Sequence, residues 1–148
     1  MKKYGIQIKK IPDGYSDKIL AIEKESFSDA WTVGMLDEEL KSPTARAFAV
    51  FAEDGLTAYI FCRAVCGDAE ILRIAASKKS RRQGYASALL AYTLEQLKNE
   101  GIKKVFLEVD FRNLPAKKLY EKYGFQKISV RRAYYEGKYD AEIYSAAL

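Results

Sequence analysis

The sequence predicts a fold of the α/β or α+β class, in which a mixed central β-sheet is flanked by helices. Short apolar segments indicate strands, longer segments with apolar residues three and four positions apart indicate helices, and turns with glycine or proline separate them. In chain order they give β-α-α-β-β-β-α-β-α-β-β, which a sandwich around a mixed sheet accommodates. Because the 148 residues contain no repeat or linker, we expect a single domain over residues 1–148.

The first half of the chain is predicted to hold four strands and two helices. The elements are a strand over residues 6–11, a helix whose apolar face includes Ile19, Ile22 and Phe27, a helix over 33–41 after Thr32 as its N-cap, and strands over 47–52, 56–65 and 70–76. Thr32 marks a helix start because a hydroxyl before the first turn accepts a backbone N–H that has no partner inside the helix.

The second half is predicted to hold two helices and three strands. The elements are a long helix from Gly84 to Gly101, a strand over 102–110, a helix from Asn113 to Gly124 with Pro115 in its first turn, and strands over 125–130 and 140–147. Proline fits the first turn because the N–H that it lacks would have no helical partner there. Glycine fits the end because the chain leaves a helix in a left-handed conformation.

The composition is that of an ordinary globular protein, with 49% hydrophobic and 30% charged residues. No apolar run approaches the roughly 20 residues that span a membrane, so we expect no membrane partner. The basic start, Met1–Gly5, has no apolar segment behind it, and we expect no secretory signal there. With two cysteines, Cys62 and Cys66, placed four residues apart on one strand face, we predict buried thiols in a reduced, cytoplasmic protein.

The absence of histidine limits the chemistry. With no His and two Cys among the 148 residues, a Cys/His zinc site is nearly excluded, and no acidic cluster indicates a metal site of another kind. We therefore expect no metal. Any proton transfer must use a carboxylate, lysine, tyrosine or cysteine.

Charge is divided unevenly along the chain. Residues 1–70 carry 9 Lys and Arg against 12 Asp and Glu, a net of −3, whereas residues 71–148 carry 16 against 8, a net of +8. One interpretation is solvated faces on a basic protein. Another is a polyanionic ligand on the second half, with an acidic first half near a cationic substrate. A nucleic-acid-binding module would also suit the basic half, but no RNP, KH or helix-turn-helix pattern is present, and we expect no direct nucleic-acid contact.

The segment Arg81-Arg82-Gln83-Gly84-Tyr85-Ala86 lies between a predicted strand and a predicted helix. Glycine lets the backbone approach a ligand closely, and consecutive N–H groups at a helix N-terminus attract phosphate. Alone, the pattern R-x-x-G-x-A is also compatible with a basic loop before an ordinary helix.

A second segment follows at a fixed spacing. It reads Asn113-x-x-Ala116-x-x-Leu119-Tyr120-x-x-x-Gly124-Phe125 and comes directly after the strand that carries Glu108. By itself it is a capped amphipathic helix. Together, in this order and at this spacing, the two segments are a strong signal.

On these segments the sequence resembles the GNAT superfamily of N-acetyltransferases, whose donor motif R/Q-x-x-G-x-G/A matches Arg81–Ala86. The likeness is greatest to the branch that acetylates the N-terminal alanine of a ribosomal protein. It extends over nearly the whole chain: Phe27-Ser28-Asp29-Ala30-Trp31, Phe106-Leu107-Glu108-Val109, Leu119-Tyr120-Glu121, Arg131-Arg132-Ala133-Tyr134-Tyr135 and Asp140-Ala141.

The resemblance implies a GNAT fold and a role for each matching residue. Glu108 would be the general base and Tyr120 the general acid. Acetyl-coenzyme A would be held by Ile74, Ala75, Ala76, Arg81, Arg82, Gln83, Gly84, Tyr85, Ala86, Ser87 and Asn113, and the acceptor would be lined by Trp31, Tyr134 and Tyr135. From the residues alone, Glu108 could equally be a half-exposed strand carboxylate, Tyr120 one core aromatic among 11 tyrosines, and the tyrosine pair a packing contact.

Three departures from the branch pattern concern local shape and charge. Ala30 replaces a proline beside the expected acceptor entrance, Ala86 replaces the last glycine of the loop, and Lys78-Lys79-Ser80 replaces a more acidic or proline-containing lead-in. None of them removes a group that the chemistry needs.

The resemblance thus predicts direct transfer of acetyl from acetyl-coenzyme A to the α-amine of a protein N-terminus, within a ternary complex. The expected acceptor and partner is the N-terminal alanine of a small-subunit ribosomal protein. A GNAT enzyme that acetylates a lysine or a small-molecule amine is the alternative within the same family.

Overall fold

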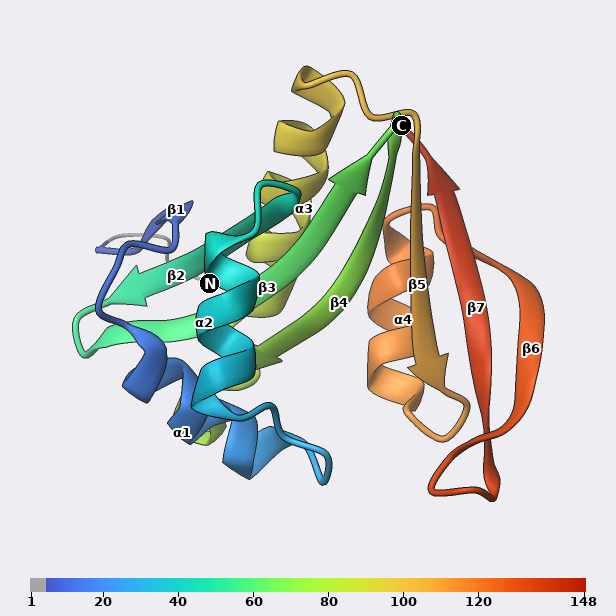
Figure 1. Ribbon diagram of the computed structural model, residues 1–148, viewed down its shortest axis with the longest axis horizontal. Helices are drawn as coiled ribbons and strands as arrows, with labels where there is room; N and C mark the ends of the chain where they lie inside the picture. The colour runs from blue at the N-terminus through green and yellow to red at the C-terminus, as the bar shows by residue number, and fades with distance from the viewer. Residues whose placement is uncertain (1–4) are drawn as a thin grey trace.

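The computed structural model describes residues 5–148, which form one seven-stranded sheet with helices on both of its faces (Figure 1). The strands are β1 (Gln7–Lys10), β2 (Ala45–Ala52), β3 (Gly55–Val65), β4 (Asp68–Ala76), β5 (Lys104–Asp110), β6 (Gln126–Tyr135) and β7 (Tyr139–Ala147). The helices are α1 (Ser16–Ser26), α2 (Val33–Lys41), α3 (Tyr85–Asn99) and α4 (Leu114–Lys122), with a 3-10 turn η1 (Lys78–Ser80). The predicted class and element order are confirmed.

Two helix starts form by the capping interactions that the sequence predicts. The Thr32 hydroxyl accepts a hydrogen bond from the Met35 N–H at 3.2 Å and begins α2. The Asn113 side chain accepts from the Ala116 N–H at 3.2 Å and begins α4, with Pro115 in the first turn. Both caps fix where a helix begins, and only three residues separate the end of β5 from the start of α4.

The sheet packs between two helical layers. On one face, α3 and α4 cover a core that includes Leu89, Leu97, Leu107 and Tyr120. On the other face, α1 and α2 cover β2, β3 and the end of β4 around Ile19, Leu36 and Phe61. No helix among residues 5–148 is long and apolar enough to cross a membrane.

The strand order β1-β2-β3-β4-β5-β7-β6 places β4 beside β5, and this pair is parallel while the other neighbours are antiparallel. Pairing is confined to Asp68–Ile71 against Lys104–Leu107. Beyond Ile71 the register of β4 with β3 shifts, so that Phe61 pairs with Arg73, Cys62 pairs with Ile71, and Leu72 is an extra residue. From this bulge onward β4 follows β3 and β5 follows β7, and the sheet opens (Figure 1).

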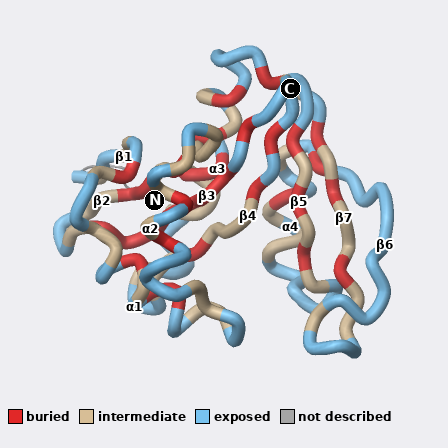
Figure 2. Tube along the Cα trace, viewed as in Figure 1, coloured by how far each residue is buried: buried red, intermediate tan, exposed pale blue. Residues whose placement is uncertain are grey.

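Three predictions about local structure were incomplete or wrong. Strand β6 continues to Tyr135, five residues beyond the predicted end, where it still pairs with β7. The sequence pattern missed this part because β6 is an edge strand that is exposed from Gln126 to Tyr134, without alternation of burial (Figure 2). The basic stretch contains the unpredicted turn η1. Cys62 is buried as predicted, but Cys66 is exposed, since it lies in the turn after β3 with φ +52°.

Candidate active site

A cleft of about 770 Å³ occupies the opening between β4 and β5. Its walls come from five parts of the fold: the end of α1 and the following loop (residues 26–29), β4 (71–74), β5 (107–110), α4 with its cap (Asn113, Ala116, Tyr120), and the β6–β7 hairpin (134–136). Ligands of open α/β sheets bind beyond the carboxyl ends of adjacent parallel strands, where the chain departs in two directions. This cleft has that position.

Glu108 lies on the wall that β5 contributes. Its neighbours Leu107 and Val109 are buried against α3 and α4, so alternation along the strand turns Glu108 to the opposite face. The carboxylate is 21% exposed and forms an ion pair with Arg131 of β6, Nη2 to Oε1 at 2.8 Å. The predicted orientation of Glu108 is thus confirmed, whereas its pairing with Arg131 was not predicted.

Tyr120 reaches the cleft from the other face of the sheet. It lies on α4, is buried, and packs its ring edge-on against Phe125 at 5.8 Å. Burial raises the pKa of the Tyr120 hydroxyl above its ordinary value, and the neighbouring Cys62 and Tyr135 raise it further. The hydroxyl therefore keeps its proton at neutral pH. The cleft brings together a carboxylate from one face and a phenol from the other.

Tyr134 and Tyr135 line the outer part of the cleft and contact each other edge-on at 5.1 Å. Burial, and then the nearby Glu108 carboxylate, raises the pKa of Tyr135 to about 12. The Arg131 guanidinium lies 4.6 Å from the ring centre of Tyr134. The sequence left two alternatives for this tyrosine pair, packing against each other or lining the site. In the structure the two rings do both.

The loop before α3 presents backbone N–H groups at the helix N-terminus. Arg82 and Gly84 both have left-handed backbone, with φ of +65° and +78°. The first bond of the helix runs from the Ala88 N–H to the Gly84 carbonyl at 3.0 Å, so the N–H groups of the first turn have no partner inside the helix. The Ser87 and Tyr123 hydroxyls are 2.6 Å apart and fix this turn to the end of α4.

Arg81 has a different position from the rest of that loop. Its Nε donates to the Ala76 carbonyl at 3.2 Å and its Nη2 to the Ser26 hydroxyl at 3.1 Å. The side chain thus returns to the end of β4 and ties it to α1.

Along the last residues of β4, the backbone N–H and C=O groups point alternately toward β3 and away from it. The Ser77 N–H bonds to the Thr57 carbonyl across β3 at 2.9 Å. Because hydrogen-bonded pairs recur every second residue in an antiparallel ladder, the backbone groups of Ala75 also face β3, and those of Ile74 and Ala76 face away from it. Of these, the Ala76 carbonyl accepts from Arg81, which leaves the Ile74 groups and the Ala76 N–H at the opening. The side chain of Ala75 is buried under α1 and α2.

Sequence reasoning missed Arg73, which is the polar centre of the part of the cleft that the end of α1 and the following loop form. Its Nε lies 3.6 Å from Oε1 of Glu23, a carboxylate of α1 that is fully buried. Its Nη2 donates to the Asp29 carbonyl at 2.7 Å, and its guanidinium lies 4.2 Å from the ring centre of Phe27. Arg73 therefore holds the α1–α2 loop against the bulge of β4.

Glu23 is the shared acceptor of this cluster. It accepts from the Tyr59 hydroxyl at 2.7 Å and from the Trp31 N–H at 2.9 Å. The Trp31 ring packs inward against Phe61 at 5.3 Å and does not form part of the cleft lining. A sequence signal for the cluster exists: a glutamate on the apolar face of one helix, and an arginine within an apolar strand.

Among residues 5–148 no group of three or more His, Cys, Asp or Glu side chains is arranged to hold a metal ion. The loop before α3 is not among the residues that line the cleft. The polar side chains that line it are Ser26, Ser28, Asp29, Arg73, Glu108, Asp110, Arg112, Asn113, Tyr120, Tyr134, Tyr135 and Glu136.

Comparisons with known proteins agree on one family. The model of the acetyltransferase (GNAT) family matches residues 16–125. The chain is 30% identical over 121 residues to a ribosomal protein bS18-alanine N-acetyltransferase of Haemophilus ducreyi, covering 80% of this chain and 81% of that protein. It is 32% identical over 120 residues to a putative enzyme of the same description from Bacillus subtilis, covering 80% of each. The crystal structure of the ribosomal-protein-S18-alanine N-acetyltransferase from Escherichia coli superposes with a TM-score of 0.90 at 25% identity, over 96% of this chain and 93% of that one.

We predict that Glu23→Gln destabilises the protein, because it leaves the Arg73 guanidinium without its buried carboxylate. Loss of one partner of a buried pair costs roughly 3–5 kcal/mol, and we expect a value near the lower end because Asp29 remains beside Arg73. Chemical denaturation measures the change. The exposed Glu38→Gln on α2 is the control, expected within about 0.5 kcal/mol of wild type. Equal stability of the two variants would contradict the role of Glu23.

Proposed function

The chain belongs to the acetyltransferase (GNAT) family, and on that premise we propose that it transfers acetyl from acetyl-coenzyme A to the N-terminal α-amine of a protein. The acceptor that we propose is the N-terminal alanine of a small-subunit ribosomal protein. The printed descriptions of the relatives from Haemophilus ducreyi, Bacillus subtilis and Escherichia coli support this choice. The observation that carries it is the cleft between β4 and β5, which Glu108 and Tyr120 enter from opposite faces of the sheet.

The donor side of the proposal rests on backbone groups. The pyrophosphate of acetyl-coenzyme A would bind the N–H groups at the start of α3, where the helix dipole favours negative charge. The Ile74 backbone groups and the Ala76 N–H would bind the amide groups of the pantetheine arm, while the Ala76 carbonyl is held by Arg81. An N–H of this edge would also stabilise the oxyanion of the tetrahedral intermediate. Asn113, which lines the cleft at the start of α4, would contact the arm from the other wall.

On the acceptor side, Glu108 would remove the proton. An α-amine has a pKa near 8, so at neutral pH most of it is protonated and must lose a proton before it attacks. A carboxylate can accept that proton directly or through one water. Arg131 would fix the Glu108 carboxylate in place, and Tyr134 and Tyr135 would border the acceptor chain.

Tyr120 would return a proton to the departing sulfur. A phenol is a weaker acid than a thiol in water, where the reference pKa values are about 10 and 8.5. In a buried site, however, desolvation disfavours the thiolate as well as the phenolate. A buried tyrosine that keeps its proton can therefore protonate a thiolate formed beside it. After attack the nitrogen still carries one surplus proton, which would return to the Tyr120 phenolate, directly or through water, once Tyr120 has protonated the departing thiolate. The products are an acetylated N-terminus, coenzyme A and one proton, which Glu108 would release to solvent.

A peptide-panel experiment tests the proposed function. The protein and acetyl-coenzyme A are incubated with peptides that have a free N-terminal alanine, with N-formylated peptides that contain an internal lysine, and with spermidine and an aminoglycoside. Mass spectrometry then locates the added group. We expect acetylation of the α-amine of the free peptides. Acetylation of lysine or of the small amines alone would contradict the proposal.

Replacement of Gly84 tests the donor site. We predict that Gly84→Val weakens acetyl-coenzyme A binding at least tenfold, because a β-branched side chain blocks the approach of the pyrophosphate to the backbone. The left-handed φ of +78° adds strain of roughly 1–2 kcal/mol. Gly101→Val is the matched control: it has a φ of +93° at the other end of α3, with open space around it. Calorimetry that finds equal coenzyme affinity in both variants would exclude the loop as the donor site.

Replacement of Glu108 tests the base. We predict that Glu108→Gln keeps coenzyme affinity and lowers turnover at neutral pH by about 10²-fold or more. The deficit shrinks as the pH rises, because the acceptor amine then loses its proton to solvent. Steady-state kinetics across the pH range measures both effects, with the exposed Glu121→Gln on α4 as the control. Wild-type turnover of Glu108→Gln at pH 7 would contradict the assignment.

Replacement of Tyr120 separates catalysis from packing. No hydrogen-bond partner of its hydroxyl is found among residues 5–148, so we predict that Tyr120→Phe changes stability by less than about 1 kcal/mol. Turnover should fall while coenzyme affinity is unchanged, because the lost interaction belongs to the transition state. Tyr120→Ala, in contrast, should destabilise by about 3–5 kcal/mol through the cavity that it opens. Normal turnover of Tyr120→Phe would make Tyr120 a packing residue only.

A further inference from the structure

A second depression of about 400 Å³ continues from the cleft along the same face of the sheet. The two share Leu107 and Glu108 as lining residues. From Glu108 the depression extends toward the paired part of β4 and β5, where α1 and α2 no longer cover the sheet (Figure 1). A chain that enters the cleft can therefore continue into this depression without crossing a helix.

The depression has an apolar floor and one wall. Phe106 and Ile143, both half-buried, form the floor on β5 and β7. Val65 stands at the edge on β3 with 55% of its surface exposed, which is unusual for a valine in a strand. These groups fit the aliphatic stem of a long side chain, since lysine and arginine bury their methylene groups against apolar surface while the head stays in water.

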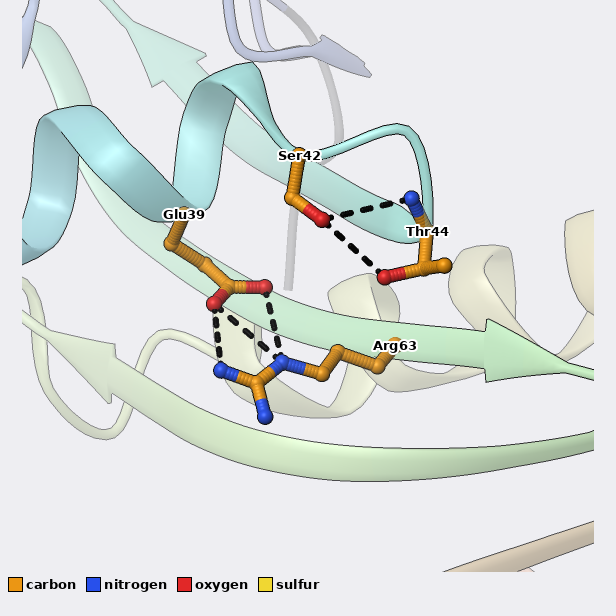
Figure 3. A network of polar contacts seen from close by, with 4 residues as sticks. All are labelled: Glu39, Ser42, Thr44 and Arg63. Atoms are coloured by element: carbon orange, nitrogen blue, oxygen red, sulfur yellow. Dashed lines mark hydrogen bonds and ion pairs between the residues drawn. The ribbon is translucent and has the colours of Figure 1, made fainter.

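Of the charged side chains around the depression, Arg63 and Glu108 are paired within the fold. The Arg63 guanidinium is occupied by Glu39 of α2, with Nη2 to Oε1 at 2.7 Å and two further contacts from Nε (Figure 3). Glu39 is itself buried, and the Ser42 and Thr44 hydroxyls, 3.0 Å apart, brace the turn that follows α2 (Figure 3). The Arg63 side chain, which comes from β3, is therefore bound to α2 through Glu39.

Glu70 is the carboxylate beside the apolar floor, since its register partner on β5 is Phe106. It is exposed, and among residues 5–148 it forms no salt bridge within 4.0 Å. Its register partner on β3 is Arg63, whose guanidinium is bound by Glu39. Three other charged groups lie near the depression. The Lys104 ammonium is 5.9 Å from the centre of the Phe106 ring, and Asp68 is the register partner of Lys104. Glu108 is paired with Arg131. The charged end of a lysine or arginine side chain between Glu70 and the apolar floor would be attracted by the Glu70 carboxylate.

We propose that this depression, the Glu70 subsite, binds the third residue of the acceptor protein and selects lysine or arginine there. The inference rests on the proposed N-terminal acetylation. The position follows from reach: Phe106, the floor of the subsite, is two residues along β5 from Glu108, or about 6.6 Å at 3.3 Å per residue. An extended acceptor whose amine lies at Glu108 places its third residue at that distance.

The test compares three peptides that differ at the third residue, with lysine, norleucine or glutamate there and a free N-terminal alanine. For the wild-type protein we expect a KM for the lysine peptide about three- to fivefold below that for norleucine, because an exposed ion pair contributes up to about 1 kcal/mol. The glutamate peptide should have the highest KM. Glu70→Gln should remove the difference between lysine and norleucine, and Glu70→Lys should make the glutamate peptide the preferred one.

Glu95→Gln, an equal charge change at an exposed position of α3 on the opposite face, is the control and should keep the wild-type order. The apolar wall is tested by Val65→Ser, which should raise the KM of the lysine and norleucine peptides together. Equal KM values for the three peptides, or an order that Glu70→Lys leaves unchanged, would overturn the subsite while the proposed function stands. No acetylation of any of the three peptides would overturn both.

Discussion

The early end of the β4–β5 pairing is the constraint on which the rest of the site depends. The two strands share only four register pairs, and the extra residue Leu72 turns β4 away at the point where Ile71 meets Leu107. Parallel strands that stayed paired would satisfy each other's backbone groups and leave no opening. Because they separate, Ile74 lines a cleft, and side chains from both faces of the sheet, Glu108 and Tyr120, can reach the same space.

An opened sheet needs support on both sides, since free backbone groups favour closure or pairing with another chain. On one side β5 is held along its whole length by β7. On the other side the buried Glu23 and Arg73 tie α1 and the following loop to the bulge of β4. The Tyr59 hydroxyl and the Trp31 N–H satisfy the Glu23 carboxylate by hydrogen bonds. The buried Arg73 Nε has no hydrogen-bond partner among residues 5–148 and is held by its charge, 3.6 Å from Glu23, so the pair depends on both partners being present. The same residues that hold the opening thus shape its acceptor side.

The sequence predicted those features that depend on local chemistry. The Asn113 cap, the glycine before α3 and the alternation of β5 each follow from neighbouring residues, and together they place Glu108 and the donor loop correctly relative to their elements. Features that depend on distant contacts were missed. Strand β6 is an edge strand and shows no burial pattern. Cys66 is exposed because β3 ends at Val65, the residue before it. The Glu23–Arg73 and Glu108–Arg131 ion pairs join elements that are far apart in sequence. The position of Tyr120 in the cleft was likewise not predictable from local sequence, because it depends on how α4 packs on the sheet.

The most direct test of this account is the hydrogen exchange of individual β4 amides with and without acetyl-coenzyme A, followed by nuclear magnetic resonance. The Arg73 and Ala75 N–H groups face β3 and should already be protected in the free protein, whereas those of Ile74 and Ala76 should exchange quickly. Acetyl-coenzyme A is predicted to slow exchange of Ile74 and Ala76 at least tenfold and to change Arg73 and Ala75 much less. Unchanged exchange at Ile74 and Ala76 under saturating acetyl-coenzyme A would contradict the claim that the opened edge of β4 receives the donor.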